Sequence, residues 1–202
     1  MKFKNTTNKN LGFTLIETLI AISILTASIL GLISISAKDT NNGNYAQRKV
    51  VATYLAQEGV EYIRNLRDAY VLNDAGGSQA GWNAFKTKLT TASWNALCAT
   101  TNGCYFNADS LDYNNPTQPI TAMTITACSF DDCRNAPIYY NSTTGKYNNS
   151  SLGVSAGFNR KISVTFPFPS ANEMKISSTV YWLQNGAYVS VSFTESLYNW
   201  VE

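Results

Sequence analysis

The sequence predicts an α+β fold, in which a long helical N-terminal part precedes a globular head with an antiparallel β-sheet. Residues 18–37 carry no charged side chain and are long enough to cross a bilayer as a helix. Residues 51–66 show apolar and aromatic side chains at helical spacing. Residues 161–166, 174–183 and 188–195 alternate polar and apolar side chains, as strands do. The expected parts of the chain are residues 1–12, 13–37, 38–72 and 73–202.

The composition argues against several classes of enzyme and against nucleic-acid binding by charge alone. The chain of 202 residues contains no histidine, which removes Ser-His and Cys-His mechanisms and the commonest metal ligand. The net charge of +2 is too small for bulk electrostatic binding of nucleic acid. The charge is uneven, because Lys2, Lys4 and Lys9 lie in the first twelve residues, which contain no acidic side chain. Residues 1–12 therefore form a basic leader on a nearly neutral protein.

The apolar segment behind this leader predicts a membrane-spanning helix. At 1.5 Å per residue, residues 18–37 form about 30 Å of helix, the thickness of a bilayer core. The lysines before the span favour a cytoplasmic N-terminus. A cleaved secretory signal peptide fits poorly because the apolar run is too long, so a plain signal-anchor helix is the simpler alternative. Neither explains Glu17, since a carboxylate near the end of a membrane helix is costly and indicates a functional position.

The residues around Glu17 carry a resemblance to a known family. Residues 12–17 read Gly-Phe-Thr-Leu-Ile-Glu, behind a short basic leader and before an apolar helix. This arrangement looks like the class III signal of type IV prepilins and pseudopilins. The resemblance implies that a membrane aspartyl peptidase cuts between Gly12 and Phe13 and methylates the new amine of Phe13. It also implies that the apolar helix first anchors the subunit and then packs with its neighbours in the core of a filament.

Glu17 also has a physical reason to take part in assembly. Within a bundle of helices its carboxylate is buried and needs a partner of opposite charge. The free amine of Phe13 on a neighbouring subunit is a suitable cation. Such a pair fixes the axial register of one subunit against the next, which is the best-attested use of a buried ion pair.

A second helical pattern follows the apolar span. Residues 38–43 are polar, and a pattern from residue 44 to about residue 72 then places apolar side chains on one face. We expect this face to pack on its own domain, and a partner-binding helix is the alternative. In the family that the signal resembles, both helical halves form one spine, in which Gly31, Gly43 and the Asn pair at 41–42 are candidate weak points. The expected buried positions are Val51, Tyr54, Leu55, Glu58, Gly59, Tyr62, Ile63 and Leu66.

The remaining residues predict the head. Residues 76–78 form a loop, residues 82–94 a short helix, and residues 99–155 loops with short strands. The three C-terminal strands form an antiparallel meander, since Asn185-Gly186 is a strong hairpin signal. Its apolar face, which includes Val189, Val191 and Phe193 but is interrupted by Ser178, is expected to cover the spine. Residues 197–200 either tuck back or cap the sheet.

The four cysteines, Cys98, Cys104, Cys128 and Cys133, all lie beyond the membrane segment. The exporting side of a membrane favours disulfides, and the short loops favour the local pairs 98–104 and 128–133. A crossed pairing stays open. A zinc site is disfavoured because there is no C-x-x-C spacing, and a catalytic thiol because there is no histidine. We expect no metal and no cofactor.

The function that these observations favour is a structural subunit of a type IV pilus or related filament, and we expect a minor pilin. The alternatives are a pseudopilin of a type II secretion system and a tip subunit that binds a surface or DNA. A membrane-anchored hydrolase is disfavoured because no catalytic motif is found. The expected partners are the prepilin peptidase, other pilin subunits and the inner-membrane assembly platform. The expected location is the inner membrane, crossed once with the head outside, and then a cell-surface filament.

Two further patterns are expected to have no role in binding. Asp109, Asp112 and Asn114 do not match a calcium loop and are read as a polar turn. Six aromatic residues in the loop-rich region are expected to fill the core or a filament contact, and an adhesive or DNA-stacking surface is the alternative. They are Tyr105, Phe106, Tyr113, Tyr139, Tyr140 and Tyr147.

Overall fold

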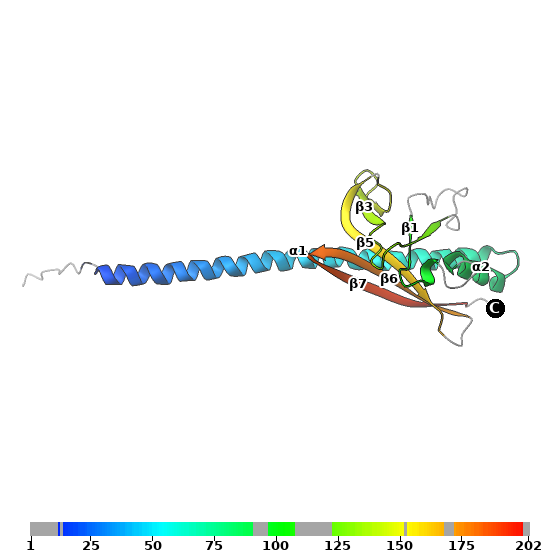
Figure 1. The fold of residues 1–202 in the computed structure, drawn as a ribbon, viewed down its shortest axis with the longest axis horizontal. Helices are drawn as coiled ribbons and strands as arrows, with labels where there is room; N and C mark the ends of the chain where they lie inside the picture. The colour runs from blue at the N-terminus through cyan, green and yellow to red at the C-terminus, as the bar shows by residue number, and fades with distance from the viewer. Residues whose placement is uncertain are drawn as a thin grey trace, which may run out of the picture. The chain divides into compact units, whose positions relative to one another are not determined.

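The computed structural model describes residue 12 and residues 14–90, 97–107, 123–151, 153–167 and 172–199. It divides into two compact units, residues 1–46 and residues 47–202, and each unit is described by itself. Helix α1 (Leu15–Asn73) belongs to both units, and all other helices and strands belong to the second, which is the head. The α+β fold class is confirmed, with the labelled elements shown in Figure 1.

Helix α1 is continuous from Leu15 to Asn73, so the two predicted helical halves are one helix. The polar residues 38–43 and both glycines, Gly31 and Gly43, are helical. A glycine in an exposed helix costs about 1 kcal/mol relative to alanine, which is too little to stop a helix of this length. Thr40 donates a hydrogen bond to the carbonyl of Ser36, 3.0 Å away, and keeps its hydroxyl within the helix.

The buried face of α1 in the head differs from the predicted stripe. Leu55, Gly59, Ile63 and Leu66 are buried as expected, but Tyr54 is 69% exposed, so its assignment to the core was wrong. In the first turns of α1 within the head, Ala52, Ala56 and Gly59 face the sheet, and these small residues let the backbone of α1 approach the strands closely. The side chains that the stripe missed are Ala52, Ala56, Val60, Arg67 and Val71.

Helix α2 (Ser78–Thr90) confirms the predicted short helix and starts earlier than expected. Trp82, Phe85 and Leu89 lie on one face and are completely buried. A Cβ at Gly81 would lie 2.3 Å from the carbonyl oxygen of Tyr70, so α2 contacts the end of α1 at a position that needs glycine. A short 3-10 helix, η1 (Leu97–Ala99), follows.

Among the described residues, the sheet has seven antiparallel strands. The three C-terminal strands form the predicted meander, in which β6 pairs with both β5 and β7, and β5 also pairs with β1 and β3. Strand β5 begins seven residues before the predicted start, because its first half pairs with β3 across a bulge. This pairing joins two segments that are separate in the sequence, so the pattern of residues within β5 alone did not predict it. The strands are β1 (Cys104–Asn107), β2 (Thr124–Ala127), β3 (Pro137–Asn141), β4 (Lys146–Asn148), β5 (Val154–Thr165), β6 (Glu173–Gln184) and β7 (Ala187–Tyr198).

The hairpin between β6 and β7 turns at Asn185 and Gly186, whose φ angles of 50° and 81° are those of a two-residue primed turn. Strand β7 lies at the edge of the described sheet, and Val189 and Val191 are partly buried. Phe193 is 38% exposed, so its assignment to the core was wrong. The next position on that face is Glu195, which pairs with Arg64 of α1, so a polar contact replaces apolar cover there.

The described core of the head has two large clusters, on either side of Gly59 along α1, and a small third cluster around the Cys128–Cys133 disulfide. One large cluster joins the last turns of α1 to α2 and the sheet around Trp82, and the other joins Ala52, Leu55 and Ala56 to Trp182 of β6. Between them, a Cβ at Gly59 would lie 2.4 Å from the hydroxyl oxygen of Ser178. The serine that interrupts the face of β6 is therefore the residue that the helix backbone approaches.

Candidate functional site

The N-terminal unit begins with a capped helix. The carbonyl of Thr14 accepts hydrogen bonds from the backbone amides of Glu17 and Thr18, at 3.1 and 3.2 Å. The hydroxyl of Thr14 accepts a longer one, 3.4 Å, from the amide of Glu17. Thr-x-x-Glu is a capping-box pattern, and residues 14–17 carry it, so the sequence contained a helix-start signal that our reading missed.

Two of the predicted processing and assembly residues, Gly12 and Glu17, lie at this capped end. Gly12 is exposed, Glu17 is exposed in the first turn of α1, and Phe13 lies outside the described residues. No hydrogen bond or ion pair joins the Glu17 carboxylate to another described side chain. A carboxylate at this end of a helix interacts favourably with the helix dipole and remains available to a cation from outside the chain.

The first unit exposes its whole apolar surface. Every described residue from 14 to 46 is exposed, and α1 is long and apolar enough to cross a membrane by length and composition. Exposure of this surface to water is unfavourable, so we expect lipid or protein to cover it. Its large apolar side chains are Leu15, Ile16, Leu19, Ile20, Ile22, Ile24, Leu25, Ile29, Leu30, Leu32, Ile33 and Ile35.

The hydroxyl groups of this segment are compatible with an apolar environment. Thr18, Ser23, Thr26, Ser28 and Ser34 each donate to a carbonyl three or four residues earlier in the helix, at 2.8–3.0 Å. A polar group that finds its partner in its own helix needs neither water nor a neighbouring protein. These five residues therefore do not oppose insertion into a bilayer.

The head contains two disulfides, and both are the local pairs. Cys98 is joined to Cys104 and Cys128 to Cys133. The first bond links η1 to β1 inside the larger core cluster, and Cys98 and Cys104 are completely buried. The second closes a surface loop in which Asp132 accepts hydrogen bonds from Arg134, one of them 2.9 Å from Nε. The side chain of Asp132 is thus occupied within its own loop.

We expect the exported protein to carry both bonds. Maleimide labelling of denatured protein without reductant should modify none of the four cysteines, and labelling after reduction should modify all four. Limited proteolysis should release no fragment that links residues 98–104 to residues 128–133 before reduction. Four reactive thiols in the exported protein would overturn this prediction, and a linked fragment would indicate the crossed pairing instead.

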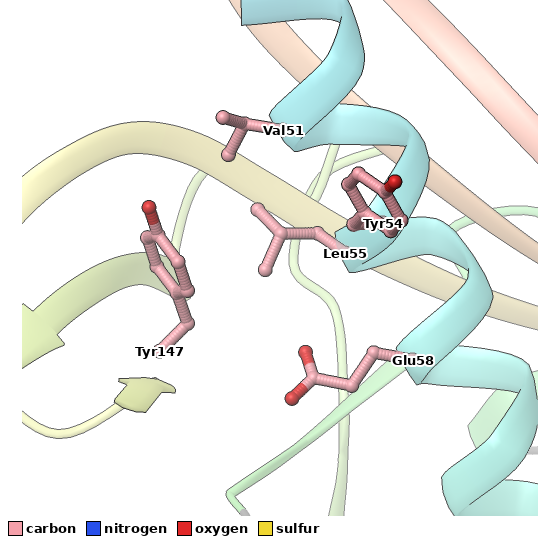
Figure 2. Close-up of a pocket in the computed structure, with 5 residues that line it drawn as sticks. All are labelled: Val51, Tyr54, Leu55, Glu58 and Tyr147. Carbon is pink, nitrogen blue, oxygen red and sulfur yellow. The ribbon is translucent and has the colours of Figure 1, made fainter. Parts of the chain in front are cut away.

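The surface of the head has an apolar groove beside α1. It has a volume of about 320 Å³, and Val51, Tyr54, Leu55 and Glu58 of α1 line it together with Tyr147 of β4. Figure 2 shows Val51, Leu55 and Glu58 extending from α1 toward Tyr147. The four α1 residues have the spacing i, i+3, i+4 and i+7 of one helix face. The predicted buried stripe included all four of them, but in the structure they line this groove at the edge of the core.

A buried arginine holds the polar end of this groove. Arg160 of β5 is 5% exposed, and its Nη1 donates to the carbonyl of Leu55 at 3.1 Å and to Oε2 of Glu58 at 2.9 Å. Its guanidinium also lies over the ring of Phe106, 4.6 Å from the centroid. These contacts fix the Glu58 side chain and attach α1 to the sheet. No local sequence pattern indicated this arginine, which lies in a strand 102 residues from Glu58 along the chain.

A second arginine joins α1 to the edge of the sheet. Arg64 pairs with Glu61 of its own helix and with Glu195 of β7. The hydrogen bond to Glu195 raises the pKa of the Arg64 guanidinium above its ordinary value, so the group stays charged at every physiological pH. The contact is structural and attaches α1 to the edge strand β7.

The other candidate ligands give no site in the part of the chain that the structure describes. No group of three or more acidic or cysteine side chains is arranged to hold a metal among the described residues. Asp109, Asp112, Asn114 and Tyr113 lie outside those residues. Of the other aromatic residues in the loop-rich region, Phe106 is buried, Tyr140 is 39% exposed, and Tyr105, Tyr139 and Tyr147 are partly buried.

Comparison with known proteins finds one match, to the N-terminal segment. Residues 7–33 match the family model described as the prokaryotic N-terminal methylation motif. No curated protein and no solved structure matches the chain. The matched segment contains Gly12, Phe13, Glu17 and most of the exposed apolar surface of α1.

Proposed function

We propose, from the type IV prepilin and pseudopilin signal that residues 7–33 carry, that this protein is a structural subunit of a type IV pilus or a related filament. The observation that carries the proposal is the motif together with a helix that exposes its entire apolar surface over residues 14–37. A bilayer covers such a helix before assembly, and a bundle of pilin helices covers it afterwards.

The proposed sequence of events follows from the N-terminal residues. The basic leader, residues 1–12, stays on the cytoplasmic side because of its lysines. There the prepilin peptidase cuts after Gly12 and methylates the amine of Phe13. The apolar helix then anchors the subunit with its head outside, until the inner-membrane assembly platform adds it to a filament. In the bundle, Glu17 pairs with the Phe13 amine of a neighbouring subunit.

The motif supports a structural subunit rather than an enzyme. The head supplies large apolar cores, two disulfides and arginine contacts that attach α1 to the sheet, which are the properties of a rigid module carried on a helix. The sequence contains no histidine, and no group of side chains among the described residues is arranged to hold a metal, so no catalytic role is indicated by these features.

A minor pilin, a pseudopilin and a tip subunit differ in copy number, in the proteins they depend on and in their position in the filament. A minor pilin enters a filament at low copy number beside a more abundant subunit, which quantitative mass spectrometry of sheared filaments measures. A pseudopilin depends on an outer-membrane secretin and accompanies secreted exoenzymes, whereas a pilus with a retraction ATPase indicates pilin function. A tip adhesin or DNA-uptake subunit would be confined to filament ends.

The processing step gives the direct test. We expect mass spectrometry of sheared filaments to show a chain that begins at N-methylated Phe13, because the small Gly12 fits the cleft of an intramembrane protease. Gly12→Ala should still be cut, while Gly12→Val should accumulate uncut in the membrane. An intact chain beginning at Met1 in assembled filaments would contradict the proposed function.

A further inference from the structure

The groove beside α1 belongs to a larger feature of the head surface. Tyr54 is 69% exposed and stands between two hollows, the groove described above and a second of about 250 Å³ lined by Val50, Thr53 and Gln57. Val50 is 55% exposed. A tyrosine ridge between two hollows, with apolar side chains around it, is the shape that receives the ridges of a second helix.

The groove also has a polar point, a carboxylate oxygen that is left open by the Arg160–Glu58 ion pair. Its apolar lining contains one carboxylate, Glu58, whose Oε2 bonds Arg160, while no described side chain donates a hydrogen bond to its Oε1. The occupant that fits is therefore apolar along most of its length and carries one cation at the end that meets Glu58. A long cationic side chain satisfies both needs, because its stem packs on apolar walls while its head meets the carboxylate.

The chain itself contains such a segment. Lys38 is the only cation between Lys9 and Arg48, and it follows the uncovered apolar part of α1. We propose that residues 31–38 of a second copy of this chain dock in the groove, with α1 of the two copies parallel and Lys38 facing Glu58. This inference rests on the proposed function, since it names one contact by which copies of the subunit assemble.

The register follows from aligning the two charges. With Lys38 opposite Glu58, positions twenty residues apart face each other, so that Ile35 meets Leu55 and Gly31 meets Val51. The remaining position on this face places Ser34 against the Tyr54 ridge, so the large side chains of the head meet small or apolar ones. Glycine and serine at these points let the helices approach closely.

The other available cations do not fit the groove. Pairing Glu58 with Arg48 would place Asn41 and Asn44 against Val51 and Tyr54, and pairing it with Lys49 would place Asn42 there. Burying these amides without partners in an apolar groove costs free energy. Charge and hydropathy therefore agree on the Lys38 register.

The contact can form only after a subunit leaves the membrane. Residues 31–37 belong to the proposed membrane span, whereas residues 51–58 lie in the head, so two copies that are both anchored cannot bring these segments together. The contact joins two different faces and is heterologous, so it propagates along a filament instead of closing a dimer. It involves a different neighbour from the one that supplies an amine to Glu17, because that register is offset by only four residues.

Cysteine cross-linking tests the register. The variant with Ser34→Cys and Tyr54→Cys carries two thiols that face each other across the proposed contact, and the four native cysteines are already paired. A short bismaleimide should produce a ladder of dimers and higher oligomers from sheared filaments, and none from the membrane pool. The control variant, Ser36→Cys with Tyr54→Cys, moves one thiol to the opposite side of the helix and should give at least tenfold less product.

The outcomes separate the inference from the proposed function. The filaments are assembled with the variant in excess, so that copies of it are neighbours. Such filaments that give no ladder, or as much product with Ser36→Cys, would overturn the register and leave the filament role intact. A ladder from the membrane pool would also overturn it. Adding Lys38→Glu should reduce the ladder severalfold, while Lys38→Arg should preserve it. A chain that is never cleaved and never enters filaments would instead refute the proposed function itself.

Discussion

Glu17→Leu is expected to insert in the membrane and to be cut after Gly12, but to enter filaments poorly. Insertion should improve, because an acidic residue costs about 2.5–3.5 kcal/mol at the centre of a membrane helix and less near its end. Assembly should fail, because the variant leaves the Phe13 amine of a neighbouring subunit without its counter-ion in the helix bundle. Removing one partner of a buried ion pair typically costs about 3–5 kcal/mol, which corresponds to at least a hundredfold loss.

The measurement is the ratio of variant to wild-type protein in sheared filaments, normalised to the cleaved protein in the membrane. Thr18→Leu is the matched control, since the Thr18 hydroxyl bonds its own helix at 2.8 Å and its loss removes no partner from a neighbour. The control should assemble like the wild type. A ratio near one for Glu17→Leu would mean that Glu17 serves only peptidase recognition or a headgroup contact. The pair of Glu17 with the Phe13 amine would then not set the axial register of neighbouring subunits.

Gly59→Ala is expected to destabilise the head. The added Cβ would lie 2.4 Å from Ser178 Oγ, 3.0 Å from Arg160 Cδ and 3.2 Å from Ile162 Cδ1. These side chains must therefore change rotamer, or β5 and β6 must move away from α1. Overfilling a packed contact costs about 1–3 kcal/mol, which exceeds the gain of up to about 1 kcal/mol in helix propensity. Thermal unfolding of the full chain in detergent, followed by the fluorescence of the buried Trp82 and Trp182, should therefore show a lower midpoint.

Two further variants give this prediction its controls. Gly43→Ala adds a Cβ with no atom within 4 Å and should raise the midpoint or leave it unchanged. Ser178→Ala removes a buried hydroxyl that has no hydrogen-bond partner among the described residues, so it should be tolerated alone and should rescue Gly59→Ala. Equal effects of alanine at residues 43 and 59 would show that the close approach of α1 and β6 does not limit stability.

The sequence determined the features that depend on neighbouring residues. The leader, the Gly12–Phe13 junction and Glu17 form a linear signal, and we propose that a peptidase recognises it along the chain. The hairpin at Asn185-Gly186 and the short helix around Trp82 follow from local conformational preferences, and both are present as expected. The meander followed in turn, because alternating strands joined by such turns pair with their neighbours.

The tertiary structure decided the features that depend on the shape of a distant partner. Leu55 and Gly59 lie on the predicted face of α1, but the buried face is rotated from it. Ala56 is therefore buried, and Tyr54, on the opposite side of the helix from Ala56, is exposed, while Gly59 fits closely against Ser178. The disulfide pairing needed the distances between loops, and the Arg160–Glu58 contact joined residues that no local pattern connects. Periodicity in the sequence locates the buried face of a helix only to within about one residue, or 100° of rotation. Packing selects the exact face, because a change of a single atom in a close contact produces a steric clash.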